Sequence, residues 1–83
     1  MKTTTVKSYE EIIDFIAAGN TPEGVVAFRP SPTVVKRVAR LIKRSKADSL
    51  SAKEQSELED YLQLEHIMIM AKARARQYTN VGR

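Results

Sequence analysis

Residues 51–78 form a run of 28 residues without glycine or proline, and this run limits the fold more than any other part of the chain. It opens with Ser51 and Glu54, whose spacing is that of a helix-capping box. Apolar residues then recur at alternating intervals of three and four, which is typical of a helix that packs along its length. This seam contains Tyr61, Leu64, Met68, Ala71, Ala75 and Tyr78. We expect one long C-terminal helix, about 40 Å in length, on which the remaining elements pack.

A first helix is predicted over about residues 9–18. Ser8 and Glu11 have capping-box spacing, and the residues that follow them are mainly apolar. Gly19 and Asn20 then form a typical helix end, because both tolerate the left-handed backbone conformation that closes a helix.

A second main helix is predicted over about residues 32–46, because Ser31-Pro32 combines a capping oxygen with a proline at the first helical position. The segment between the two helices, residues 22–28, permits either a short helical turn or a short strand. Thr21-Pro22 is a helix-start signal, whereas Gly24 and the two valines that follow it weaken a helix. The helical turn is the favoured alternative.

These elements predict an all-α fold with three main helices and a long C-terminal helix, in a single small domain over residues 1–83. Residues 1–7 and 79–83 are expected to be flexible ends. One apolar stripe is expected on the second main helix, formed by Val34, Val35, Val38, Leu41 and Ile42. In the last helix, Leu58, Tyr61, Leu62 and Leu64 are expected to face inward, with Glu57, Glu59, Asp60 and Glu65 facing outward.

The charges are arranged in blocks of opposite sign. Residues 29–46 hold seven basic residues and no acidic residue, whereas residues 47–66 hold six acidic residues and one lysine. Oppositely charged neighbouring helices attract each other, so these two blocks predict an antiparallel helical hairpin.

Several classes of site are excluded by composition. The chain has no cysteine and one histidine, which rules out disulfides, thiolate metal sites and multi-histidine metal sites. Its three glycines are scattered, so no phosphate-binding loop is present. We expect no catalytic residue, metal, cofactor or small-molecule substrate. No signal peptide or membrane span of about 20 apolar residues is found, so a cytoplasmic protein is expected.

Around residues 67–70 the long helix becomes apolar nearly all round and needs cover on more than one side. This pattern indicates either packing within the monomer or binding to another protein, which is a partner protein or a second copy in a homodimer. The candidate partner-binding residues are Leu64, Ile67, Met68, Ile69, Met70, Ala71, Ala75 and Tyr78.

The basic block is a candidate nucleic-acid interface, formed by Arg29, Lys36, Arg37, Arg40, Lys43 and Arg44. No aromatic residue interleaves these bases, which favours contact with duplex DNA over stacking on single strands. A small DNA-binding transcriptional regulator is therefore an alternative function, and a ribbon–helix–helix protein is one form of it if residues 24–28 are a strand. The same bases could instead pair with the acidic start of the last helix.

The sequence also resembles a known group of proteins. Tyr61-Leu62-Gln63-Leu64-Glu65-His66 and Lys72-Ala73-Arg74-Ala75-Arg76, together with Phe28-Arg29-Pro30-Ser31, are similar to segments of small, mostly cyanobacterial, uncharacterised antitoxin-like proteins. Some of these are encoded beside nuclease-like proteins of the histidine–asparagine–histidine type. The resemblance implies a companion protein that binds a toxin or a nuclease, and it transfers no catalytic residue.

Overall fold

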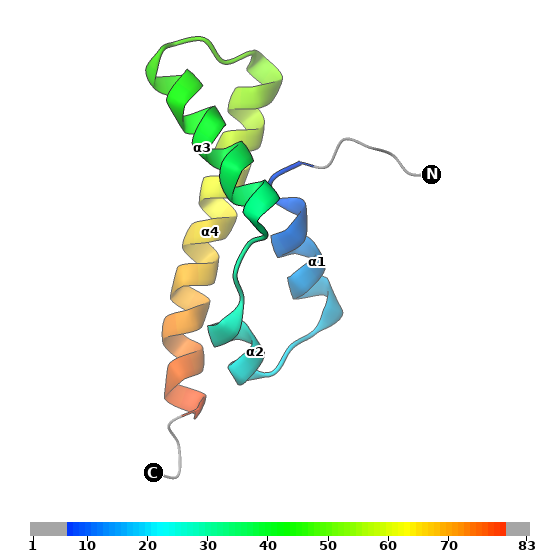
Figure 1. The fold of residues 1–83 in the computed structure, drawn as a ribbon. Helices are drawn as coiled ribbons and strands as arrows, with labels where there is room; N and C mark the ends of the chain where they lie inside the picture. Colours follow the sequence, from blue (N-terminus) through cyan, green and yellow to red (C-terminus); the bar gives the residue numbers. More distant parts are fainter. Residues whose placement is uncertain (1–6, 80–83) are drawn as a thin grey trace, which may run out of the picture.

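A computed structural model describes residues 7–79, and within this range the chain is all-α, with four helices and no strand (Figure 1). The helices are α1 (Glu10–Ala18), α2 (Pro22–Ala27), α3 (Pro32–Lys46) and α4 (Ala52–Thr79). The all-α prediction with a long C-terminal helix is confirmed. Of the ends predicted to be flexible, residues 1–6 and 80–83 lie outside the described residues, and Thr79 belongs to α4.

The starts of α3 and α4 follow the predicted capping chemistry. Ser31 Oγ accepts a hydrogen bond from the N–H of Val34 at 3.3 Å. At the start of α4, the Glu54 N–H donates to Ser51 Oγ at 3.1 Å, and Glu54 Oε1 accepts from the Ser51 N–H at 3.1 Å. This reciprocal pair is a complete capping box, so both helix starts are confirmed.

Residues 22–27 form the short helix α2, so the strand alternative is wrong, and with it the ribbon–helix–helix alternative. Thr21 Oγ1 accepts from the Gly24 N–H at 3.0 Å, and Pro22 occupies the first helical position. These two starting contacts offset the low helix propensity of the glycine and valines that follow.

The predicted capping box at the start of α1 is wrong. Tyr9 occupies the N-cap position and makes no capping bond through its side chain. Ser8 is buried, and its backbone N–H donates to Glu57 Oε2 at 2.9 Å. Glu11 Oε1 instead accepts from the N–H of Ser31 at 2.8 Å. Both residues are thus taken up by contacts with distant segments, which local spacing does not reveal. The predicted end is confirmed, because Gly19 follows α1 with a φ of 75°.

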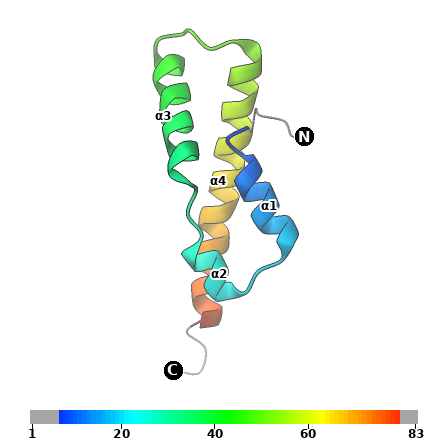
Figure 2. The same cartoon turned by 45° about the vertical axis from the view of Figure 1, so that its right-hand side comes forward.

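α3 and the first half of α4 form the predicted antiparallel hairpin (Figure 2). α1 packs beside the middle of α4, and α2 packs beside its C-terminal half. The Phe15 and Phe28 rings, with centroids 4.5 Å apart, join α1 to the end of α2. One core runs through these contacts and consists of Ile12, Val34, Val38, Leu41, Leu58, Tyr61 and Met68.

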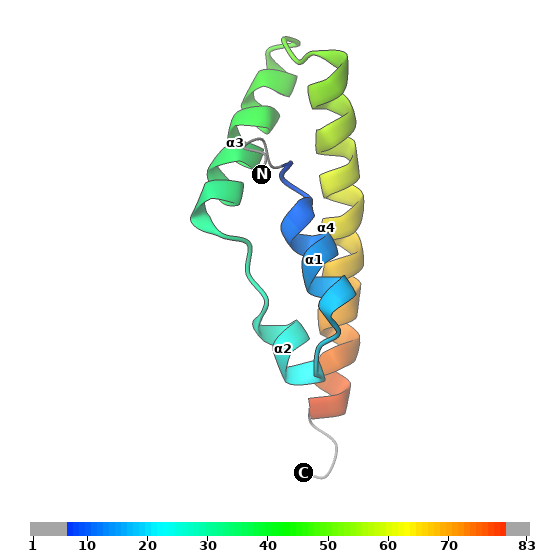
Figure 3. The same ribbon diagram turned by 90° about the vertical axis from the view of Figure 1, so that its right-hand side faces the viewer.

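The molecule is a thin slab with an open edge. Its principal extents are 50 × 33 × 18 Å, and its radius of gyration is 14.9 Å, whereas a compact domain of this length would have about 12 Å. In Figure 3, α1, α2 and α3 all lie on one side of α4, which leaves the opposite side of α4 uncovered. Among residues 7–79, no helix is both long enough and apolar enough to cross a membrane.

This thin shape overturns several predicted positions. Leu62 is 43% exposed, and Val35 and Ile42 are also exposed, although all three were expected to face inward. A helix that contacts neighbours on one side only buries a narrow stripe, so apolar residues beside that stripe stay in solvent. Glu57 shows the opposite error: it was expected to face outward but is buried.

Candidate protein-interaction surfaces

Two bases of the basic block are taken up by ion pairs inside the hairpin. Arg37 Nε and one terminal guanidinium nitrogen of Arg37 each donate to a Glu57 carboxylate oxygen at 2.6 Å. Arg44 pairs with Glu54 at 2.7 Å. The Arg37 hydrogen bonds, helped by the Ser8 N–H, lower the pKa of Glu57 from 4.5 to about 2. The same hydrogen bonds raise the pKa of Arg37. The pairing alternative is therefore correct for these two bases.

The other four predicted nucleic-acid-binding bases have different surroundings. The Arg29 guanidinium donates to the backbone carbonyls of Val26 and Phe28, at 3.2 and 2.8 Å. Lys36, Arg40 and Lys43 are exposed on α3 and form no ion pair with another described residue. Their spacing of four and three places them along one side of the helix. The basic surface of α3 is thus smaller than the sequence indicated.

Lys72 joins the C-terminal half of α4 to the segment between α2 and α3. Its ammonium donates to the Phe28 carbonyl at 2.7 Å. Burial lowers the pKa of Lys72, and the positive charges of Arg29 and Arg76 act in the same direction. Lys72 therefore connects α4 to the segment after α2 and is not a free surface charge.

The eight predicted partner-binding residues differ in burial: two are buried, two are partly buried and four are exposed. Met68, 5% exposed, and Ala75 are buried in the core of the chain itself, so they are not available on the surface. Leu64 and Ala71 are partly buried. The four exposed residues are Ile67, Ile69, Met70 and Tyr78, with exposed fractions of 48%, 58%, 52% and 63%. The surface candidates are thus these last four.

An apolar groove of about 300 Å³ lies where α1 and α2 meet α4. It is lined by Phe15, Ile16, Asn20, Val25, Ile67, Met68 and Ala71. Ile16, on the α1 side, is 52% exposed, and Ile13 on the same helix is also exposed. Neither residue was among the predicted partner-binding residues. The signal was that α1 has more large apolar residues than the single face of a nine-residue helix can bury.

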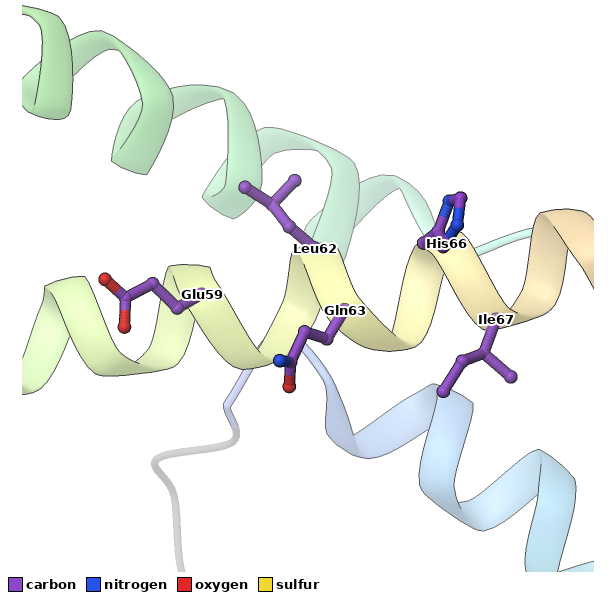
Figure 4. Close-up of a pocket in the computed structure, with 5 residues that line it drawn as sticks. All are labelled: Glu59, Leu62, Gln63, His66 and Ile67. Atoms are coloured by element: carbon purple, nitrogen blue, oxygen red, sulfur yellow. The ribbon is translucent and has the colours of Figure 1, made fainter.

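The second surface is the outer face of α4, which we define as Glu59, Gln63, His66, Met70, Ala73 and Gln77. Its first three residues, with Leu62 and Ile67 at the two edges, line a shallow hollow (Figure 4). Leu62 points toward α3 and Ile67 points toward α1, while Glu59 lies nearer the start of α4. All of these side chains come from one helix, which makes the hollow an exposed helix face and not an enclosed cavity.

No group of three histidine, aspartate or glutamate side chains in residues 7–79 could hold a metal ion. Comparison of the chain with protein families, curated proteins and solved structures finds no match.

Proposed function

We propose that this chain is a non-enzymatic, antitoxin-like interaction protein that binds a partner protein through the groove between α1 and the C-terminal half of α4. The sequence resemblance supplies the class of partner, a toxin or a nuclease. The groove supplies the contact: an apolar segment of the partner would lie between Ile16 and Ile67 and continue toward Tyr78.

One observation carries this proposal: the two walls of an apolar groove each present an isoleucine that is about half exposed. Ile16 is 52% exposed on one wall and Ile67 is 48% exposed on the other. Fully burying such a side chain contributes about 1.5–3 kcal/mol. Covering the two exposed halves would therefore contribute about 2 kcal/mol before other contacts are added. Single exposed apolar residues are common on protein surfaces, but two that face each other across a groove are typical of binding sites.

Co-expression with the product of the neighbouring gene tests the proposal. We expect the two proteins to co-purify, and we expect Ile16→Glu to abolish co-purification, because a carboxylate in the groove would be desolvated without a partner. Val35→Glu is the matched control, since Val35 is an equally exposed apolar residue on α3, away from the groove. Failure of the wild-type proteins to co-purify, or equal loss with both variants, would contradict the proposal.

A second function, binding of duplex DNA, is favoured by one observation. Lys36, Arg40 and Lys43 remain exposed in a line on α3, without an ion pair among the described residues. Three phosphate contacts would give a slope of about −2.7 for the logarithm of affinity against the logarithm of salt concentration. Affinity for duplex DNA would then fall about 40-fold when salt rises fourfold.

The slope tests whether the bases of α3 make these phosphate contacts. Arg40→Ala and Lys43→Ala together should reduce the slope to about −1, since each lost contact removes about 0.9. An unchanged slope in this double variant, or no binding at low salt, would rule out α3 as a DNA-binding helix.

A further inference from the structure

We propose that two copies of the chain pair through the outer faces of their α4 helices, in antiparallel orientation, about a two-fold axis beside Met68. This interface goes beyond the proposed function, because it uses the face of α4 that points away from α1, α2 and α3 (Figure 3). The groove that faces α1 stays free for the partner protein, and only Ile67 borders both surfaces.

The outer face of α4 forms a continuous stripe along the helix. Glu59, Gln63, His66, Met70, Ala73 and Gln77 recur at alternating intervals of four and three. They form a second seam on α4, on the side opposite the buried seam that contains Tyr61, Met68 and Ala75. Leu62, Ile67, Ile69 and Met70 supply exposed apolar area on and beside this stripe. Small Ala73 lets the two helices approach closely.

Charge along α4 selects the antiparallel orientation. The exposed Glu59 and Asp60 lie before the centre of this seam, and the exposed Arg74 and Arg76 lie after it. An antiparallel pair with its axis beside Met68 brings Asp60 of each copy opposite Arg74 of the other. Neither residue has an ion-pair partner among residues 7–79. A parallel pair would place acid against acid and base against base, which is unfavourable.

The apolar flanks of the seam fit the same register. In this arrangement Ile67 meets Ile67 of the second copy on one flank, and Ile69 meets Ile69 on the other, because both lie one residue from the axis. Met70 lies against His66 of the second copy in the centre. Ile69 and Met70, which are 58% and 52% exposed in the single chain, are thus both covered in this interface. A self-complementary patch of this kind closes into a dimer and does not extend into a fibre.

Single-cysteine variants test the orientation directly, because the natural chain contains no cysteine. Ile69→Cys lies about 3 Å along the axis from its symmetry mate, whereas Gln77→Cys lies about 27 Å from its own. With a short bismaleimide linker, we expect the first variant to form a covalent dimer and the second to stay monomeric on a denaturing gel. Linking of both variants would show a parallel pair, and linking of neither would show a monomer; either result overturns the proposal.

Charge reversal tests the register. Arg74→Asp and Asp60→Arg should each shift the molar mass from that of a dimer to that of a monomer by light scattering, because each places like charges together. The double variant Asp60→Arg/Arg74→Asp should restore the dimer. Lys36→Glu, on α3, is the control and should remain dimeric. Loss of the dimer in the double variant, with circular dichroism unchanged, would reject this register.

Different variants test the dimer and the binding of the partner protein. Ile69→Glu should abolish the dimer and leave co-purification with the partner protein intact, whereas Ile16→Glu should do the reverse. If the wild-type chain is monomeric and Ile16→Glu still abolishes co-purification with the partner protein, only the dimer proposal is overturned.

Discussion

At the scale of single residues, Glu57 joins three segments of the chain. Its carboxylate accepts two hydrogen bonds from Arg37 on α3 and one from the backbone N–H of Ser8 before α1. It therefore fixes the angle of the hairpin and the entry of the chain into α1 at the same point. Its identity as an acid on a predicted helix could be read from the sequence, but its burial could not. The seam of α4, extended back by four residues from Tyr61, reaches Glu57 and not the exposed Glu59, but the arginine that allows an acid to be buried there lies on another helix.

The pKa of Glu57 predicts acid sensitivity. In the folded chain this pKa is about 2, below its ordinary value of 4.5, so the ionised group stabilises the fold by about 3 kcal/mol at neutral pH. That contribution is fully present above about pH 4.5 and is lost as pH falls toward 2; about 2 kcal/mol is gone by pH 3. Urea unfolding at pH 7 and pH 3 measures the loss.

The variant Glu57→Gln isolates this contribution. It should be less stable than the wild-type chain at pH 7, and its free energy of unfolding should fall by about 2 kcal/mol less on acidification to pH 3. Glu59→Gln, at an exposed position, should follow the wild-type curve. Identical pH dependence in Glu57→Gln and the wild-type chain would exclude the buried ion pair as the cause.

At the scale of elements, the positions of the helices could be predicted from sequence, because caps, prolines and glycine act within a few residues. The start of α3 at Ser31, the start of α4 at Ser51 and the end of α1 at Gly19 all follow this local chemistry. The exposure of Leu62 could not be predicted, because it depends on how many neighbours the finished fold places around α4. The groove was missed for the same reason, since α1 supplies one of its walls.

Ser51 and Ser8, the serines of the two predicted capping boxes, of which only the Ser51 box forms, should respond differently to substitution. Ser51→Ala removes a real capping bond at the start of α4 and should lower the free energy of unfolding by about 1 kcal/mol. Ser8→Ala leaves the backbone N–H that reaches Glu57 in place, and it removes a buried hydroxyl that has no partner among the described residues. Its stability should be unchanged or raised by up to about 1 kcal/mol.

Thermal or urea unfolding of both variants at pH 7 measures this contrast. A loss of about 1 kcal/mol in Ser8→Ala would mean that Ser8 caps α1 in solution, as its spacing to Glu11 suggested.

At the scale of the whole molecule, one long helix has two sides with different surroundings. α4 has an inner seam that α1, α2 and α3 cover, and an outer face that they leave open (Figure 1). An 83-residue chain has a limited core, and this one arranges it as a slab 18 Å thick in place of a sphere. Apolar side chains that a rounder fold would hide therefore stay exposed, among them Ile16 at the groove and Met70 on the outer face of α4.

Met68 and Met70 separate the two sides of α4. Met68 is 5% exposed and Met70 is 52% exposed, so Met68→Ala should cost about 2–4 kcal/mol of stability, and Met70→Ala should cost the monomer under about 0.5 kcal/mol. Pairing of two copies, as proposed, would make the stability of the wild-type chain depend on protein concentration, since association stabilises the folded chain by mass action. The urea midpoint of Met68→Ala should be low at every protein concentration. The urea midpoint of Met70→Ala should equal that of the wild-type chain at low protein concentration and lie below it at high protein concentration. If Met70→Ala is as unstable as Met68→Ala in dilute solution, the outer face of α4 is covered within the monomer, and neither surface of this helix is free in the way that the structure indicates.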